Sequence, residues 1–190
     1  LLTNEYPAAD LEITKSVETN GAVDEDGTPI EYLSALVSAT CTFDNGTGPT
    51  TVWSITNQPV TPTSSISKTG LPAGTTCTVT ETNQRGATTM STVTTSAGSI
   101  DDDATPAAFE LTEGENSVAF ANDFGFGSLS VTKALAGLAK DEDWAQGPFT
   151  VRVVCTNLNA TSTTVFDDTF ELSPLTPTAL IENLATGSSC

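Results

Sequence analysis

The sequence contains no histidine, and its six basic residues face 24 acidic ones, which gives a formal net charge of −18. The lack of histidine removes the commonest general base and the commonest zinc ligand from any site that this chain could build. The shortage of lysine and arginine argues against binding to nucleic acid or an anionic membrane surface, because phosphate groups are bound by basic patches. No apolar run is long enough to span a bilayer, so we expect no membrane insertion in this segment.

Long stretches with helical periodicity are also missing. The sequence instead contains many short runs in which apolar and polar residues alternate, separated by clusters of Gly, Pro, Asn and Asp. Such runs are typical of β-strands joined by turns. The sequence therefore predicts an all-β chain built from sandwich domains.

One strand-like pattern occurs twice. LEITKSV at residues 11–17 and LSVTKAL at residues 129–135 place Lys15 and Lys133 at equivalent positions, 118 residues apart. Asn4 precedes the first of these lysines by 11 residues, and Asn122 precedes the second by the same number. Repeats of this length are typical of tandem domains, each an independent unit of an array.

The repeat predicts where the domains begin and end. We expect residues 1–8 to be the last strand of a preceding repeat and residues 9–126 to be one complete β-sandwich. Residues 127–190 should be the N-terminal part of a following repeat, which lacks its later strands in this chain because nothing after Cys190 corresponds to the segment that follows Cys77.

The four cysteines form two matching pairs. Cys41 and Cys77 are 36 residues apart, Cys155 and Cys190 are 35 apart, and each pair joins a similar strand to a similar turn. None has the close spacing of a zinc or redox motif. We expect one disulfide per domain, with buried free thiols as the alternative. Closing a loop of this size contributes roughly 3–4 kcal/mol in the chain-entropy treatment, and disulfides indicate an oxidising, extracellular setting.

Three predicted strands direct a polar side chain toward the core. Strand alternation places Lys15 on the same face as Leu11 and Ile13, and it likewise places Glu81 and Asn122 among apolar neighbours. Lysine is almost never fully buried unless another group pairs with it or a reaction uses it. A single site that contains all three residues explains the pattern better than three unrelated exceptions.

The chemistry that fits this trio is an intramolecular isopeptide bond. A buried lysine has a lowered pKa and can act as a neutral nucleophile, while a buried carboxyl group can stay protonated and move protons. Lys15 would attack the side-chain amide of Asn122 with help from Glu81, and ammonia would leave. Two alternatives remain open: a noncovalent Lys15–Glu81 ion pair, and a lysine that reaches solvent at a sheet edge.

The arrangement resembles the CnaB-type domains of Gram-positive adhesins and pilins. In that family a Lys on the first strand bonds an Asn or Asp on the last, assisted by a Glu in a middle strand, and VTET at residues 79–82 matches the middle segment. ITK (13–15), VTK (131–133), LPAGTTCTVTET (71–82) and FAN (120–122) also resemble repeats of actinobacterial surface proteins. The resemblance implies tandem immunoglobulin-like sandwiches in which Lys15 is the nucleophile, Glu81 the acid/base and Asn122 the acceptor. It implies that Asn4 and Lys133 serve the preceding and following repeats.

These patterns predict a structural stalk or shaft segment of an extracellular, cell-surface protein rather than an enzyme. Its partners would be neighbouring repeats of the same chain or fibre, and a host or surface ligand is a further candidate. We expect no cofactor and no metal, because none of the acidic clusters in the loops has the ligand spacing of a calcium loop. Two alternatives are a ligand-binding adhesin module and a filament subunit whose N-terminal strand completes the last domain of a neighbouring chain.

Overall fold

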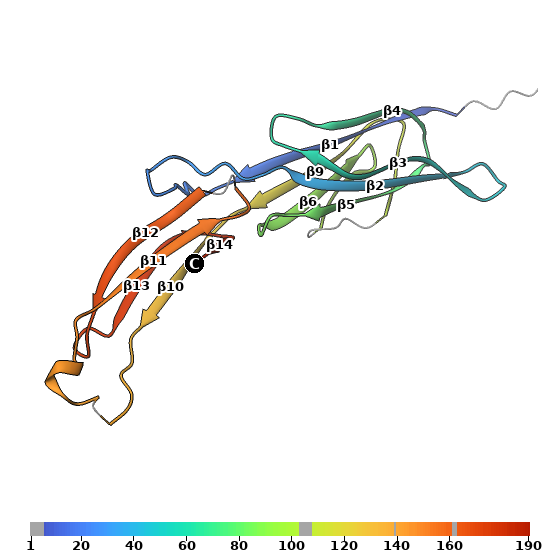
Figure 1. Ribbon diagram of the computed structural model, residues 1–190. Coiled ribbons are helices and arrows are strands. Elements are labelled where there is room, and N and C mark those ends of the chain that lie inside the picture. Colours follow the sequence, from blue (N-terminus) through green and yellow to red (C-terminus); the bar gives the residue numbers. More distant parts are fainter. Residues whose placement is uncertain (1–5, 103–107, 139, 161–162) are drawn as a thin grey trace, which may run out of the picture. The chain divides into compact units, whose positions relative to one another are not determined.

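The computed structural model describes residues 6–102, 108–138, 140–160 and 163–190 (Figure 1). Its regular elements are strands apart from one short 3₁₀-helix, so the all-β prediction is confirmed. Within the described ranges, no helix has the length and apolar character needed to cross a membrane. The elements are β1 (Ala8–Glu18), β2 (Ala35–Asp44), β3 (Pro49–Val60), β4 (Ile66–Pro72), β5 (Thr76–Asn83), β6 (Thr88–Thr95), β7 (Gly98–Asp102), β8 (Phe109–Glu110), β9 (Gly114–Asp123), β10 (Phe126–Thr132), η1 (Asp143–Ala145), β11 (Phe149–Asn157), β12 (Thr163–Leu172), β13 (Thr178–Ala185) and β14 (Ser188–Ser189).

The chain divides into two compact units. The first contains the chain up to Glu18 together with Ser34–Asp123, and the second contains Thr19–Leu33 together with Phe124–Cys190. The connection between β1 and β2 is therefore part of the second unit, although the repeat in the sequence groups it with the first. The predicted strand at residues 1–8 lies largely outside the described residues.

The first unit has a core enclosed by two sheets. The strand order is β4-β1-β9-β6-β7 in one sheet and β3-β2-β5-β8 in the other. Buried apolar side chains of both sheets meet in one cluster, with Leu11, Ile13 and Phe120 from the first sheet and Val37 and Val79 from the second. Two sheets that face each other across an apolar core make this unit a β-sandwich.

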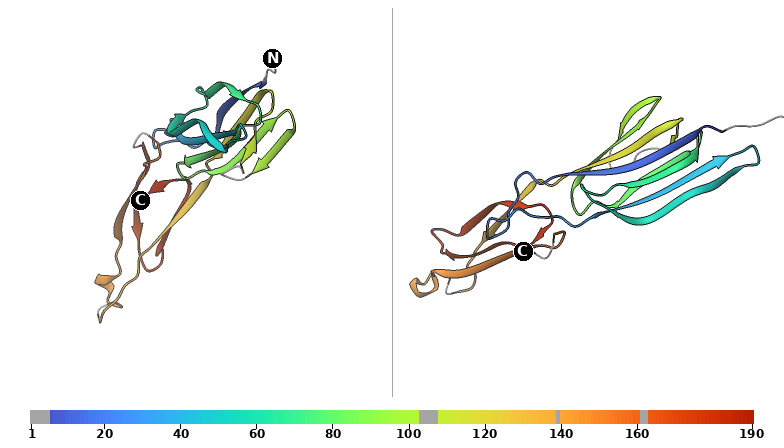
Figure 2. Two further views of the ribbon diagram at one scale, coloured as in Figure 1. Left: turned by 90° about the vertical axis from the view of Figure 1, so that its right-hand side faces the viewer. Right: turned by 90° about the horizontal axis from the view of Figure 1, so that it is seen from above.

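The first and last long strands of this sandwich are neighbours. β1 and β9 pair in parallel, in continuous register from Ala9 opposite Gly114 to Glu18 opposite Asp123. Both views in Figure 2 show them side by side, β1 in blue and β9 in yellow. Parallel strands need a long crossover connection, and here the whole intervening sandwich supplies it.

Both predicted disulfides are present. Cys41 on β2 and Cys77 on β5 are directly opposite in neighbouring strands of one sheet, with their Cα atoms 4.1 Å apart. The Cα atoms of Cys155 and Cys190 in the second unit are 4.0 Å apart. Each disulfide thus lies within one unit.

A buried asparagine fixes the entry to β9, and strand alternation in the sequence did not single it out. Asn116 is 3% exposed, and its side-chain oxygen accepts hydrogen bonds from both the backbone N–H and the hydroxyl of Thr112. Its side-chain nitrogen donates to the backbone carbonyls of Asp10, Thr112 and Gly114. A buried amide needs hydrogen-bond partners for its polar atoms, and Asn116 finds them in these backbone groups. The contact with Asp10 joins the start of β9 to β1.

The second unit contains a two-stranded sheet, β10-β13, and a three-stranded sheet, β12-β11-β14. Its main apolar cluster includes Val153, Cys155 and Ile181. A second cluster forms where the segment Thr19–Leu33 packs, with Ala22 and Ile30 against Ala160 and Ala185. This segment therefore supplies part of the core of the second unit.

Tyr32 is the main aromatic contact of that segment. Its ring stacks on Phe124 with a centroid distance of 3.5 Å and an interplanar angle of 13°. Its hydroxyl lies 3.4 Å from the carbonyl oxygen of Thr186, at the long end of hydrogen-bond distances.

Replacing Tyr32 by Ala should therefore destabilise the second unit by about 2 kcal/mol, because a partly buried aromatic ring and its stacking partner lose their contact. Hydrogen exchange measured by mass spectrometry should show faster exchange in peptides of β11 and β13. Tyr32→Phe is the matched control, since it keeps the stacked ring and loses only the contacts of the hydroxyl group with Thr186 and Asn157. Equal protection in the Ala and Phe variants would contradict the assigned role of the ring.

Candidate functional site

Three buried polar side chains from three strands meet inside the first unit. Lys15 comes from β1, Glu81 from β5 and Asn122 from β9. The side chains of Lys15 and Glu81 are 1% and 0% exposed, and Asn122 is 3% exposed. The structure thus brings together the three residues that strand alternation in the sequence assigned to one site.

Strand register explains why these residues meet. On β1, Lys15 follows Leu11 and Ile13 on the buried face, and on β9, Asn122 follows Val118 and Phe120. Lys15 is directly opposite Phe120 in the parallel pair, so Asn122 lies diagonally across from it, two residues further along β9. Glu81 projects from the facing sheet as the inward-pointing residue after Val79.

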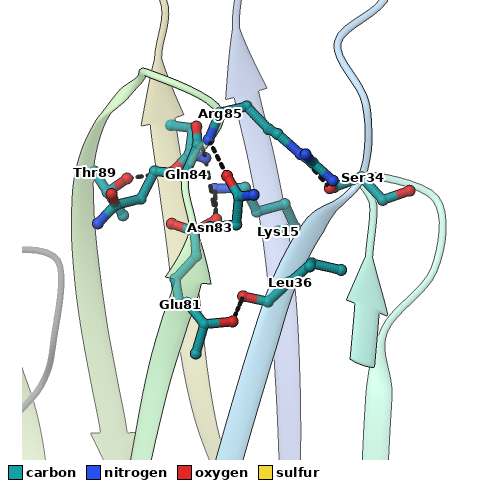
Figure 3. Close-up of polar contacts among 10 residues, drawn as sticks. Lys15, Ser34, Leu36, Glu81, Asn83, Gln84, Arg85 and Thr89 are labelled. Atoms are coloured by element: carbon teal, nitrogen blue, oxygen red, sulfur yellow. Dashed lines mark hydrogen bonds and ion pairs between the residues drawn. The ribbon is translucent and has the colours of Figure 1, made fainter. Parts of the chain in front are cut away.

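One oxygen of Glu81 contacts both nitrogens of the trio. Glu81 Oε1 lies 3.1 Å from Lys15 Nζ and accepts a hydrogen bond of 3.0 Å from Asn122 Nδ2. Figure 3 shows Lys15 and Glu81 directed toward this common point. The carboxyl group therefore bridges the nitrogen that would attack and the nitrogen that would leave.

Two polar atoms of this site lack a hydrogen bond. Within the described part of the chain, Lys15 Nζ and Glu81 Oε2 are buried atoms with no hydrogen-bond partner, since the Nζ contact with Oε1 lacks hydrogen-bond geometry. Burial lowers the pKa of Lys15, and the nearby Glu81 carboxylate only partly offsets this. A lysine in this position is closer to the neutral, nucleophilic form than a lysine in water.

The amide oxygen of Asn122 is bound by a residue outside the predicted trio. Thr89 Oγ1 donates a buried hydrogen bond of 2.7 Å to Asn122 Oδ1, while Glu81 contacts the amide nitrogen. Thr89 is directly opposite Asn122 in the β6–β9 pair and is 6% exposed. Sequence reasoning missed this residue because the two large apolar residues of β6, Met90 and Val93, lie on opposite faces, so alternation does not decide which face is buried.

The turn between β5 and β6 completes the site. Arg85 and Gly86 have φ values of 58° and 86°, and Ala87 N donates to the carbonyl of Gln84 at 3.1 Å. Two consecutive positive φ values and this hydrogen bond are the features of a type I′ hairpin turn. The Gln84 carbonyl also lies 3.5 Å from Asn122 Nδ2, so the turn places a second acceptor beside the amide nitrogen.

The two predicted inter-repeat residues are not part of this cluster. Asn4 lies outside the described residues. Lys133 belongs to the second unit, where its backbone N–H donates to the carbonyl of Pro177 and its Nζ lies 4.7 Å from the centre of the Phe149 ring. Among the residues that the structure describes, no group of three or more His, Cys, Asp or Glu side chains is placed to hold a metal ion.

Several solved structures are similar to part of this chain. The major pilin of Streptococcus pyogenes is 18% identical over 62% of this chain and 48% of its own, with a TM-score of 0.42. The major pilin T-13 of the same organism is 17% identical over 62% of this chain and 45% of its own, with a TM-score of 0.36. A pilus-presented adhesin, Cpa, is 18% identical over 60% of this chain and 26% of its own, with a TM-score of 0.35. The matched region thus spans less than half of each of these proteins.

No curated protein sequence matches the chain significantly. A family described as "Domain of unknown function (DUF5979)" matches it over residues 11–124 and again over residues 129–190. The first match contains Lys15, Glu81 and Asn122, and the second begins at the first residue of LSVTKAL. Because these two matches cover most of the sequence, the chain belongs to the DUF5979 family.

Proposed function

We propose that the chain is a load-bearing stalk segment of an extracellular surface protein, locked by an autocatalytic Lys15–Asn122 isopeptide bond of the CnaB type. The observation that carries the proposal is the contact of one Glu81 oxygen with both Lys15 Nζ and Asn122 Nδ2 inside the core. The two disulfides favour an oxidising location outside the cell.

The geometry supports a single-turnover reaction in which Glu81 moves the protons. With Lys15 as a neutral amine and Glu81 as a carboxylic acid, Nζ attacks the side-chain carbonyl carbon of Asn122. The carboxyl group gives its proton to Nδ2 as the carbon–nitrogen bond breaks, and it takes one proton from Nζ. One amine and one primary amide become one secondary amide and one ammonia, and Glu81 returns to its starting form.

The product removes the unfavourable features of the unreacted site. A buried amine without hydrogen bonds becomes an uncharged amide nitrogen, whose N–H can donate to Glu81 Oε1. The amide oxygen keeps its hydrogen bond from Thr89. Burying a charged or unsatisfied polar group costs about 1–3 kcal/mol or more, so bond formation is favoured by the core that surrounds it.

The position of the bond fits a mechanical role. Lys15 and Asn122 lie near the C-terminal ends of β1 and β9, the first and last long strands of the first unit. A covalent link between them would carry tension from β1 directly to β9. The approximately 100 residues between them would be bypassed, including the Cys41–Cys77 disulfide.

Intact-mass measurement of the wild-type chain tests the proposal. The mass should be lower than the sequence mass by one ammonia beyond the hydrogens lost in the two disulfides, and the ammonia deficit should persist after reduction. Digestion should yield a branched peptide in which the segment with Lys15 is joined to the segment with Asn122. A reduced chain with the full sequence mass would refute the isopeptide bond and leave the noncovalent ion pair as the description of the site.

A further inference from the structure

We infer that Thr89 is a catalytic residue of bond formation, as the hydroxyl donor that stabilises the negative charge developing on the Asn122 side-chain oxygen. This inference rests on the isopeptide reaction proposed above and assigns a role in it that Glu81 does not fill. Thr89 Oγ1 contacts the oxygen of the reacting amide at 2.7 Å.

The reaction needs such a donor. When Nζ attacks the amide carbon, the carbonyl electrons move onto Oδ1, and a buried oxyanion is costly unless a hydrogen bond meets it. Glu81 Oε1 is engaged with the two nitrogens, and Oε2 makes no hydrogen bond within the described residues. The Thr89 hydroxyl is the group that the structure places at Oδ1.

The site also holds the hydroxyl in position before the reaction. Thr89 is 6% exposed and directly opposite Asn122 in the antiparallel β6–β9 pair, so the two side chains project from one face of the sheet. A branched side chain in a strand has few rotamers, which keeps the hydroxyl aimed at its partner. A donor that is fixed in advance stabilises the developing charge without reorganising.

The oxygen and the nitrogen of the Asn122 side-chain amide have partners on different elements of the fold. Its oxygen is held by Thr89 on β6, and its nitrogen faces Glu81 on β5 and the Gln84 carbonyl in the turn between these strands. The hairpin β5–β6 therefore presents an acid/base to the leaving group and a hydrogen-bond donor to the oxygen. Asn122 itself is on β9, which lies between β6 and β1, the strand that carries Lys15.

The test measures the rate of ammonia loss in full-length chains. Wild type, Thr89→Val, Thr89→Ser and Glu81→Gln are synthesised in a cell-free system under oxidising conditions at low temperature, quenched with acid at successive times, and weighed intact. Thr89→Val should form the bond more slowly by on the order of 100-fold, because it keeps the shape and loses the donor. Thr89→Ser should react at close to the wild-type rate. Thr88→Val, an exposed neighbour on the same strand, is the matched control and should not change the rate.

The outcomes separate this inference from the proposed function. Wild type without ammonia loss would overturn both. If wild type forms the bond and Thr89→Val forms it at a rate within threefold of wild type, the role of Thr89 is overturned and the proposed isopeptide bond stands. A Thr89→Ser variant as slow as Thr89→Val would also overturn it, since a lost hydroxyl would not then be the cause. Disulfide formation and circular dichroism show whether each variant folds. If Thr89→Val does not fold, its slow reaction supports the role of Thr89 only when Thr89→Ser folds and reacts at the wild-type rate.

Discussion

Variants that cannot form the Lys15–Asn122 bond are expected to lose about 4–5 kcal/mol of first-unit stability. The bond closes a loop of about 100 residues, for which the chain-entropy treatment gives about 4.7 kcal/mol. For a unit of this size, each kcal/mol corresponds to about 4–8 °C in melting temperature, so the first unit should melt roughly 20 °C or more below wild type. Calorimetry of the oxidised chain would resolve this transition.

Two variants distinguish the cross-link from the loss of a buried charge partner. Glu81→Gln leaves the Lys15 amine buried without its carboxylate, which adds its own cost of several kcal/mol. The double variant Lys15→Met with Glu81→Gln removes both charged groups and fills the space with an apolar side chain. The stability loss that both variants share measures the cross-link. A double variant that melts with wild type would contradict the stabilising role of the bond.

The pH dependence provides an independent check on the same prediction. In Asn122→Ala the Lys15 amine stays free, and burial lowers its pKa in the folded state from the ordinary value of 10.5. Between the lowered pKa and 10.5, the unfolded chain binds a proton that the folded chain does not, so stability rises with pH across this window. Wild type, in which the amine has become an amide, should lack this rise in denaturant titrations. The same rise in wild type would show that its lysine is free.

The second large effect is mechanical. Tension applied through the chain enters the first unit at β1 and leaves at β9, which loads the parallel β1–β9 pair in shear. In wild type, the bond between Lys15 and Asn122 should allow only the few residues of this unit outside the cross-linked loop to extend, which limits the gain in length to about 30 Å. In the double variant, rupture should release about 250 Å while the Cys41–Cys77 disulfide is intact, and about 350–400 Å after reduction.

Single-molecule stretching with handles at the chain ends measures these lengths. The unfolding event of the first unit is identified as the one that is present in the double variant and absent from wild type. The second unit provides an internal control, because its own unfolding event should occur in both proteins. A full-length first-unit event in wild type would refute the proposed load path, whatever the mass measurement shows.

The sequence by itself determined the core-facing sides of β1, β5 and β9 and the pairing of the cysteines. The two-residue period of a strand gives the face of each side chain once one face is known to be apolar, as for Lys15 among Leu11 and Ile13. The recurrence of the cysteine pairs at nearly equal spacing indicated their partners, and the structure contains both disulfides. These features depend on local alternation and on internal repetition, which one sequence displays directly.

Tertiary structure alone decided the role of Thr89 and the place of Thr19–Leu33. The face of β6 is fixed by its register with β9, where Thr89 is opposite Asn122, and this register overrides the apolar character of the exposed Met90. The segment Thr19–Leu33 packs in the second unit because apolar partners from distant strands meet it there. Both outcomes depend on contacts between residues far apart in the chain, and strand periodicity carries no information about such contacts.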